Sequence, residues 1–332
     1  MAAAHGPVKP DPAVARVRRA VREFFGEPVR TSALTTGELG VAVSGGADSL
    51  ALAEAAAFVG HRMGLRVRAL VVDHRLQPGS AEVAEHAAAT ASKLGVDEAT
   101  VLPIEVSGPG GPEAAARKAR YAALSAAMPG ALVLLGHTRD DQAETVLLGL
   151  GRGSGPRSVS GMRPLDPPWG RPLLELPRSA TEAACAALGV EPWSDPHNAD
   201  PRFTRVRLRR EVLPLLEDVL SGGVAAALAR TAKQLREDSE ALDQLADEVL
   251  LNARNGPVLE IEPLLTAPAP LRRRALRRWL LDAGVRELTD AHLRSVDDLV
   301  GAWRGQGGVW LPGDLVAGRA HGRLSLLPPG RT

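Results

Sequence analysis

Short apolar runs alternate with stretches of helical period along the first half of the chain. We interpret the apolar runs as buried parallel strands: GVAV (40–43), VRALVVDH (67–74), TVLPIEV (100–106) and ALVLLGH (131–137). Helices are expected between them, over 48–64, 80–95 and 112–128. This alternation predicts an α/β fold with a doubly wound, mainly parallel sheet. The polar loops at the carboxyl ends of its strands would line a crevice.

The second half of the chain has a different pattern. A helix is expected after Asp141, ending in the glycine-rich GLGRGSG (149–155). The proline-rich segment 163–177 predicts an irregular surface loop rather than another strand. The tail 307–328 indicates two short strands around turn glycines. Further helices are expected over 179–189, 222–253, 267–283 and 289–303.

At 332 residues the chain is long enough for two domains with separate cores. Hydrophobic residues make up 45% and charged residues 24%, as in soluble globular proteins, and no apolar run approaches the roughly 18 residues of a membrane span. The lone Cys185 excludes a disulfide framework and a cysteine metal cluster, and it fits a reducing cytoplasm. We predict a flexible arm over 1–15, a catalytic domain over 16–219, a linker helix over 220–253 and a smaller α+β C-terminal domain over 254–332.

The formal net charge of +1 does not by itself indicate a nucleic-acid partner. Arginines gather in RFTRVRLRR (202–210) and LRRRALRR (271–278), and such clusters would suit RNA phosphates. Arginine outnumbers lysine throughout the chain, however, so solvated helix faces explain both clusters equally well.

The segment SGGADS (44–49) joins the first predicted strand to the first helix. Backbone N–H groups in such a turn, together with the helix dipole, make a phosphate group its natural ligand. The segment has neither the lysine of a kinase-type phosphate loop nor the G-x-G-x-x-G spacing of a dinucleotide fold. Its hydroxyls and amides could hold phosphate, and the Asp48 carboxylate could hold Mg²⁺. The alternative is a turn in which Asp48 or Ser49 only caps the helix.

Charged side chains recur where the crevice is expected. Asp73 and His74 end the second predicted strand, while Arg117 and Arg120 lie on the helix that precedes the fourth strand. Taken singly, the histidine could cap a loop and the arginines could be solvated.

The segment GHTRDDQAET (136–145) carries the densest group of such side chains. His137 follows the fourth strand. Asp140, Asp141 and Glu144 lie three or four residues apart on the next helix, so all three acids can address one side. Taken alone, the acids could simply complement the helix dipole.

In combination, SGGADS, VVDHRLQPGSAEVAE (71–85), GPEAAARKARYAAL (111–124) and GHTRDDQAET resemble the tRNA(Ile)-lysidine synthetase family of the N-type ATP pyrophosphatases, or PP-loop enzymes. The resemblance covers about 38–215 by motif and continues more weakly into the C-terminal domain, which resembles the family's tRNA- and substrate-binding domain. It implies a ligase that adenylates the wobble cytidine of tRNA(Ile) with a CAU anticodon and then joins L-lysine to its C2. AMP and diphosphate would be released, and codon reading and aminoacylation would switch from Met to Ile.

The resemblance also implies ATP and Mg²⁺ as cofactors and assigns roles to residues. The Asp48 carboxylate would hold the metal. The ATP-binding residues would be Ser44, Gly45, Gly46, Ala47, Asp48, Ser49, Asp73 and His74. The catalytic residues would be Asp48, Arg117, His137, Asp141 and Glu144.

Substrate contacts follow from the same resemblance. Asp141 and Glu144, with Asp140 beside them, would bind L-lysine and help remove a proton from its ammonium, although any of them could instead hold Mg²⁺. Arg117 would meet a phosphate or the lysine carboxylate. Arg205 and Arg209 would contact tRNA phosphates, in a segment that departs from the family pattern at His197, Phe203 and Val206.

Other functions remain as alternatives. A tRNA thiolase of the same superfamily would need more cysteines than Cys185 alone. GMP and NAD synthetases share the glycine turn but lack the GHTRDDQAET segment, and argininosuccinate-type ligases would not need a second basic domain. A non-catalytic tRNA-binding protein would have lost the acids or the glycine turn, and both are present here. We expect no membrane association, and a homodimer is one open assembly.

Overall fold

The computed structural model describes residues 10–31, 34–75, 77–106, 111–153, 155–194 and 200–327. The chain forms two compact units, Met1–Lys233 and Gln234–Thr332, and the division between them falls within one long helix, α11 (Val224–Ala253). Each unit has its own sheet and its own core, so each is described separately.

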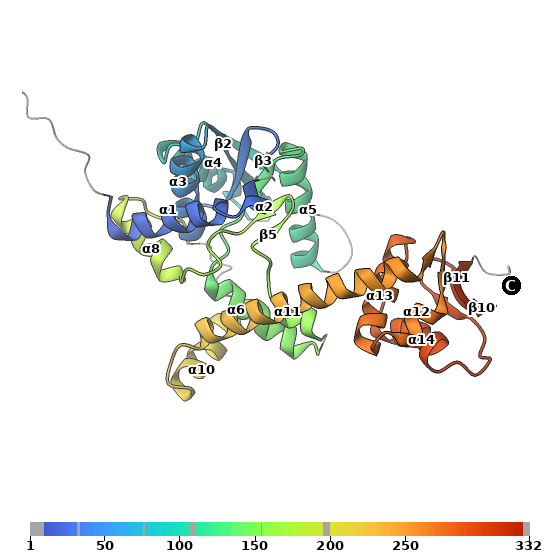
Figure 1. The fold of residues 1–332 in the computed structure, drawn as a ribbon. Helices are drawn as coiled ribbons and strands as arrows, with labels where there is room; N and C mark the ends of the chain where they lie inside the picture. Colours follow the sequence, from blue (N-terminus) through green and yellow to red (C-terminus); the bar gives the residue numbers. More distant parts are fainter. Residues whose placement is uncertain are drawn as a thin grey trace, which may run out of the picture. The chain divides into compact units, whose positions relative to one another are not determined.

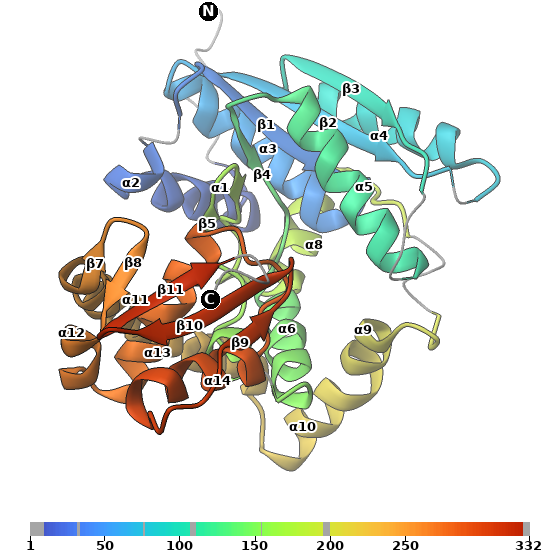
Figure 2. The same cartoon turned by 90° about the vertical axis from the view of Figure 1, so that its right-hand side faces the viewer.

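The first unit is built on a six-stranded sheet in the order β3-β2-β1-β4-β6-β5. All neighbouring strands are parallel except β5 and β6, and helices cover both faces (Figures 1 and 2). The predicted doubly wound α/β fold is therefore confirmed. The strands are β1 (Glu38–Val43), β2 (Arg66–Asp73), β3 (Glu98–Pro103), β4 (Leu132–Leu134), β5 (Leu165–Asp166) and β6 (Trp169–Gly170).

Four helices of this unit match periodic stretches of the sequence, whereas the helix Pro12–Phe25 was not among those expected. Those expected over 48–64, 80–95, 112–128 and 179–189 are all present within a few residues of these bounds. The helices are α1 (Pro12–Phe25), α2 (Pro28–Thr31), α3 (Ala47–Arg62), α4 (Ser80–Lys93), α5 (Pro112–Ala127), α6 (Arg139–Gly151), α7 (Pro156–Val159), α8 (Arg178–Ala187), α9 (Thr204–Arg207), the π-helix η2 (Leu208–Val212) and α10 (Leu213–Val219).

Strand β4 shows how the sheet is buried on both faces. Leu132 and Leu134 belong to the core cluster that includes residues of α1, α3, α4 and α8, whereas Val133 belongs to the cluster on α5. Because side chains of a strand alternate between the two faces, a fully apolar run such as this one needs helices on both sides. The doubly wound architecture supplies them.

The proline-rich segment 163–177 corrects one expectation. It contributes β5 and β6 to the sheet, and β6 pairs in parallel with β4, so it is not an irregular surface loop. Leu173 and Leu174, which follow β6 in the same segment, are buried. The strands are only two residues long, and β5 lies at the sheet edge, where prolines leave no ladder partner unsatisfied. Short edge strands of this kind carry almost no periodic signal.

Residues 12–15, which the sequence assigned to a flexible arm, belong to a helix. Helix α1 begins at Pro12, Asp11 caps it by accepting from the Ala13 N–H, and Val14 is buried. Residues 12–15 are thus helical, because their apolar positions pack into the first core.

Helix α11 confirms the long helix expected over 222–253. Among the described residues, no single helix is long and apolar enough to cross a membrane. One pair, Thr204–Val219 with Val224–Ala253, passes on length and composition alone and is bent by 95°.

The second unit contains a five-stranded antiparallel sheet in the order β7-β8-β11-β10-β9. The tail therefore forms three strands rather than the expected two, and a short hairpin from before α12 extends the sheet. Trp279 and Leu276 of α13 are buried in its core. Its elements after α11 are β7 (Arg254–Asn255), β8 (Val258–Glu260), α12 (Ile261–Thr266), α13 (Ala269–Asp282), α14 (Asp290–Gly301), β9 (Val309–Leu311), β10 (Leu315–Ala320) and β11 (Arg323–Leu327).

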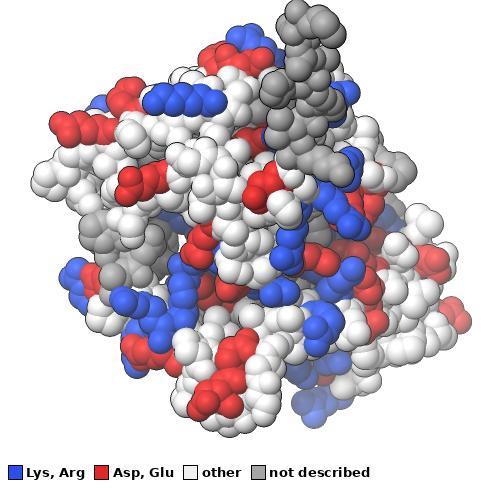
Figure 3. Space-filling view, turned by 90° about the vertical axis from the view of Figure 1, so that its left-hand side faces the viewer, with Lys and Arg blue, Asp and Glu red and all other residues white. Residues whose placement is uncertain are grey.

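The arginine cluster on α13 is largely matched by acids. Arg272 pairs with Asp297 at 2.6 Å, Arg274 with Asp243 at 2.6 Å, and Arg278 with Asp282 at 3.1 Å. On the face of the molecule drawn in Figure 3, basic and acidic side chains are likewise intermixed rather than gathered into one patch of a single sign. Arginine content alone is therefore a poor guide to an RNA-binding surface here.

The pair between Arg272 and Asp297 provides a test of a structural role for this cluster. Both side chains are largely buried, with 11% and 13% exposed, so Arg272→Ala leaves a buried carboxylate without its partner. We expect a loss of about 3 kcal/mol in the free energy of unfolding. Arg278→Ala on the same helix removes a pair whose arginine is 62% exposed and should cost less than about 1 kcal/mol. Urea denaturation followed by tryptophan fluorescence measures both values; equal costs would contradict this assignment.

Candidate active site

The glycine turn connects β1 to α3 and is closed by its own serines. Ser44 donates its N–H to Ser49 Oγ at 3.1 Å, and Ser49 Oγ donates to the Gly46 carbonyl at 2.9 Å. Gly45 has φ +84°, a conformation that favours glycine, and a Cβ there would lie 3.3 Å from Ala87 Cβ. Gly46 is the N-cap of α3, and no side chain caps the helix. Neither Asp48 nor Ser49 therefore caps α3, and the amides of an uncapped helix start are suited to bind a phosphate group.

The loop between β4 and α6 lies against this turn. A Cβ on Gly136 would come within 3.1 Å of the backbone of Asp48 and Ser49, so only glycine allows this approach. Thr138 then caps α6 in a capping box: its N–H donates to Asp141 Oδ2 at 2.8 Å. The cap fixes the Asp141 side chain at the start of the helix.

The three acids of α6 face arginines from later segments of the chain. Asp141 Oδ1 lies 2.8 Å from Arg178 Nη2 and 3.2 Å from Arg209 Nη2. Asp140 Oδ2 accepts from the backbone N–H of Arg178 at 2.9 Å. Glu144, whose side chain is fully buried, lies 2.6 Å from Arg209 Nε. The expectation that these acids address one side is confirmed.

Asp48 joins the same group of side chains. Its Oδ2 accepts from Arg178 Nε at 3.1 Å, and its Oδ1 accepts from the Thr181 hydroxyl. Arg178 therefore contacts the glycine turn and the acids of α6 at once. We call Asp48, Asp141, Glu144, Arg178 and Arg209 the arginine–carboxylate network.

Burial and charge shift the three carboxyl groups of the network in different directions. Burial raises the pKa of Asp48, although Arg178 and Thr181 oppose the rise. Burial likewise raises the pKa of Glu144 against the hydrogen bond from Arg209. Burial would also raise the pKa of Asp141, but Arg178 and the Thr138 amide outweigh it, so this pKa lies below its usual value. Environments that separate pKa values in this way are common where acids and bases have different tasks.

Comparison with known proteins decides the family. A model described as a PP-loop domain matches residues 14–216, and one described as the TilS substrate binding domain matches residues 259–325. The tRNA(Ile)-lysidine synthase of Rhodococcus erythropolis is 56% identical over 322 residues, covering 95% of this chain and 96% of that protein. That of Nocardia farcinica is 57% identical over 321 residues, covering 95% and 99%. The chain belongs to the tRNA(Ile)-lysidine synthase family.

The resemblance predicted from the motifs is thus confirmed. Among solved structures, the U34-tRNA thiolase NcsA from Methanococcus maripaludis aligns with a TM-score of 0.54 and 18% identity, covering 68% of this chain and 80% of that one. An identity this low shows a common fold and does not support the thiolase alternative. The assignment to the family therefore comes from the sequence comparisons, and the solved structure independently supports the α/β fold.

Other residues predicted for this family's site lie at the same sheet edge or near it. Asp73 ends β2, is buried, and accepts from the Arg75 N–H at 2.9 Å. Arg117 is exposed on α5, where its Nη2 donates to the Tyr121 hydroxyl at 3.3 Å. His74 follows Asp73 and is half-buried. Of the segment expected to contact tRNA, residues 195–199, including His197, fall outside the described residues.

Two features of the network were not foreseen from the sequence. Arg178 and Thr181, on the first turn of α8, bind Asp48 although they belong to none of the quoted motifs. Arg209, predicted to contact a tRNA phosphate, faces Asp141 and Glu144, and Arg205 Nη1 lies 3.8 Å from Glu144 Oε2. Their contact with tRNA stays a prediction. One sequence feature could have indicated Arg178. A positive charge at the start of a helix is unfavourable beside the helix dipole, so an arginine there is expected to have an acidic partner.

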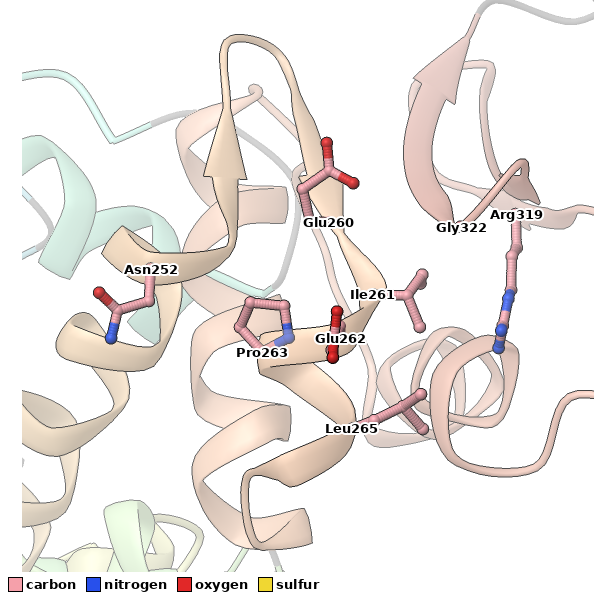
Figure 4. A pocket seen from close by; sticks show the side chains of 8 residues that line it. All are labelled: Asn252, Glu260, Ile261, Glu262, Pro263, Leu265, Arg319 and Gly322. Atoms are coloured by element: carbon pink, nitrogen blue, oxygen red, sulfur yellow. The ribbon is translucent and has the colours of Figure 1, made fainter.

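A shallow pocket in the second unit offers no comparable chemistry (Figure 4). Glu260 at its rim binds Asn255 and Arg323, and Arg319 donates to the carbonyls at the end of α14, Leu299 and Val300. Two of the three charged side chains that line the pocket, Glu260 and Arg319, therefore already have partners within the unit, and the third is Glu262.

His137 gives a prediction about pH. Its Nδ1 is buried without a hydrogen-bond partner among the described residues, and burial lowers its pKa to about 3, helped by nearby arginines and opposed by Asp141. The folded protein therefore resists protonation of His137, while the unfolded chain takes up a proton near pH 6.5. The resulting stability is complete above about pH 6.5 and is lost progressively as the pH falls towards 3.

The measurement compares the unfolding free energy of the wild type and His137→Gln at pH 7 and pH 5. The wild type should lose about 2 kcal/mol more than the variant between these values, because only it binds the extra proton on unfolding. Identical pH dependence in the two proteins would show that His137 titrates normally when folded.

Proposed function

We propose that this chain ligates L-lysine to C2 of the wobble cytidine of tRNA(Ile) with a CAU anticodon, using ATP. One observation carries the proposal: Arg178 joins Asp48 of the phosphate-binding turn to Asp141 of the acid group, so that nucleotide and amino-acid sites adjoin. The family of its relatives supports the substrates, and the geometry supports the placement of the reaction in the first unit.

The chemistry has two steps. In the first, the cytidine O2 attacks the α-phosphorus of ATP and diphosphate leaves. In the second, the neutral ε-amine of lysine attacks C2, and the C2–O bond breaks so that AMP leaves with the oxygen. The amine gives up one proton as the new C–N bond forms. The protein must therefore hold the triphosphate, neutralise diphosphate charge and take a proton from lysine.

The glycine turn fits the nucleotide. It has uncapped amides at the start of α3 and a backbone that an additional Cβ at Gly45 would crowd. No group of three or more His, Cys, Asp or Glu side chains among the described residues could hold a metal. A single carboxylate, Asp48, suits Mg²⁺ that arrives on the phosphates, since Mg²⁺ is commonly held by one or two carboxylates and the substrate. Asp48 would then hold the ion that neutralises the leaving diphosphate.

The acids of α6 fit the amino acid. Asp141, ionised by its low pKa, would attract the lysine ammonium, and Glu144, whose pKa burial raises, is the better group to receive its proton. His137, with a pKa of about 3, is too weak a base for that task and would position the substrate instead. Arg117 stays assigned to a phosphate or to the lysine carboxylate.

The remaining partners follow the same proposal. The second unit would bind tRNA, and Arg205 could meet a phosphate, being 40% exposed. A reducing cytoplasm is the compartment we propose, because the chain has a single cysteine, Cys185, and cannot form an internal disulfide. A homodimer stays a prediction from the sequence.

The proposed function is tested with purified chain, ATP, labelled L-lysine and a tRNA(Ile) transcript with a CAU anticodon. We expect labelled lysine in the tRNA, with AMP and diphosphate formed in equal amounts. A transcript with uridine at the wobble position serves as the control and should take up none. Release of ADP and orthophosphate, or no labelling of the CAU transcript, would disprove the proposal.

Two variants separate the steps. Glu144→Gln should slow the transfer of lysine to the adenylated tRNA roughly 10²- to 10⁴-fold, because the group proposed to receive the lysine proton is lost. The rate at which diphosphate is released in a first turnover, with no lysine added, should be unchanged in this variant. Asp48→Asn should slow that first turnover at least about tenfold. Rapid-quench measurement of diphosphate checks the first step, and labelled lysine in the tRNA checks the second. A Glu144→Gln enzyme that also lost the first step would move Glu144 to the nucleotide site.

A further inference from the structure

Arg178 occupies an unusual position between the two halves of the site. Its Nε contacts Asp48 Oδ2 at 3.1 Å and its Nη2 contacts Asp141 Oδ1 at 2.8 Å. These acids belong to α3 and α6, whereas Arg178 begins α8. One guanidinium thus neutralises the carboxylate proposed for the metal and the carboxylate proposed for lysine.

The helix that carries Arg178 is firmly held. Thr181 donates to Asp48, Cys185 Sγ lies 3.4 Å from the Ala47 carbonyl, and Ala184 is buried in the first core. The Arg178 backbone N–H is bound to Asp140. Movement at this junction is therefore left to the Arg178 side chain, which is 22% exposed, rather than to α8.

Both ligands of the site would compete with Arg178. An ion held by Asp48 needs an oxygen that Arg178 or Thr181 now occupies, and a lysine ammonium needs the Asp141 oxygen that Arg178 and Arg209 share. A metal ion at Asp48 would place a second positive charge beside the Arg178 guanidinium, and the nucleotide phosphates would offer that guanidinium competing oxygens, so both would draw it away from Asp141.

We propose that Arg178 is a positioning residue that couples the two sites: binding of the nucleotide with its metal at Asp48 draws Arg178 from Asp141 and so strengthens lysine binding. This inference rests on the proposed function. The inference goes beyond the proposed function because it names the side chain that sets the order of binding, in which the nucleotide prepares the site for the amino acid. The coupling is reciprocal, so lysine also strengthens nucleotide binding.

Calorimetric titration of the full chain with L-lysine tests the proposal. It is run with and without saturating Mg²⁺ and α,β-methylene-ATP, which cannot be cleaved between its first two phosphates. For the wild type we expect the nucleotide to tighten lysine binding about tenfold. In Arg178→Gln, lysine alone should bind at least as tightly as in the wild type, because one competitor for Asp141 is gone. The effect of nucleotide should nearly disappear.

Two further variants make the result specific. Arg178→Lys keeps the positive charge but cannot bridge two carboxylates with a fork, so it should also lose most of the coupling. Arg19→Gln is the matched control: it removes an exposed arginine that pairs with Glu23 on α1 and should keep the wild-type ratio. Thermal unfolding of all proteins shows whether each remains folded.

Three results would overturn the inference: a wild type whose lysine affinity ignores the nucleotide, an Arg178→Gln protein that keeps the coupling, or one that binds lysine more weakly in both conditions. The last would make Arg178 a structural support only. Lysidine formation by the same wild-type preparation separates this failure from failure of the proposed function, since an active enzyme with unaltered coupling in Arg178→Gln refutes the inference alone.

Discussion

The parallel pairing of β1 with β4 determines where this protein can do chemistry. From β1 the chain winds outward through β2 and β3, and it then returns to place β4 on the other side of β1. The connections leave the sheet in opposite directions at this point, and open α/β sheets commonly bind their ligands at the carboxyl ends of the strands where this reversal occurs. Gly136 lets the loop after β4 pack directly on the turn after β1, which brings the uncapped start of α3 beside the acids of α6.

Gathering acids at one place has an electrostatic cost that the rest of the first unit offsets. Buried carboxylates are stable only when paired, and one pairing partner comes from α8 and another from η2, both after the sheet is complete. The segments that follow the nucleotide-binding strands therefore do more than connect the two units. Arg178 and Arg209 allow Asp48, Asp141 and Glu144 to lie together before any substrate cation arrives.

The sequence predicted much of this arrangement because its signals are local. A strand, a diglycine turn and a helix are contiguous at 38–62, and so is the capping box that orients Asp141. The partners of those acids are not local: Arg178 lies 130 residues from Asp48 and 37 from Asp141. No periodicity encodes such a distance. The two-residue strands β5 and β6 escaped prediction for a related reason, since their pairing with β4 comes from tertiary packing rather than from propensity.

Paired acids change how the affinity for an amino acid must be understood. At the proposed lysine site the charge is not bare: a lysine ammonium bound by Asp141 would have to exchange with guanidinium groups that already satisfy the same oxygens. A guanidinium matches a carboxylate with a planar fork, whereas an ammonium is a compact and strongly hydrated charge, so the exchange gains little by electrostatics alone. Selective binding then requires that the ion pair between Arg178 and Asp141 be weakened before lysine binds. Because Arg178 also pairs with Asp48, binding of a nucleotide and its metal ion at Asp48 is the event best placed to weaken that pair.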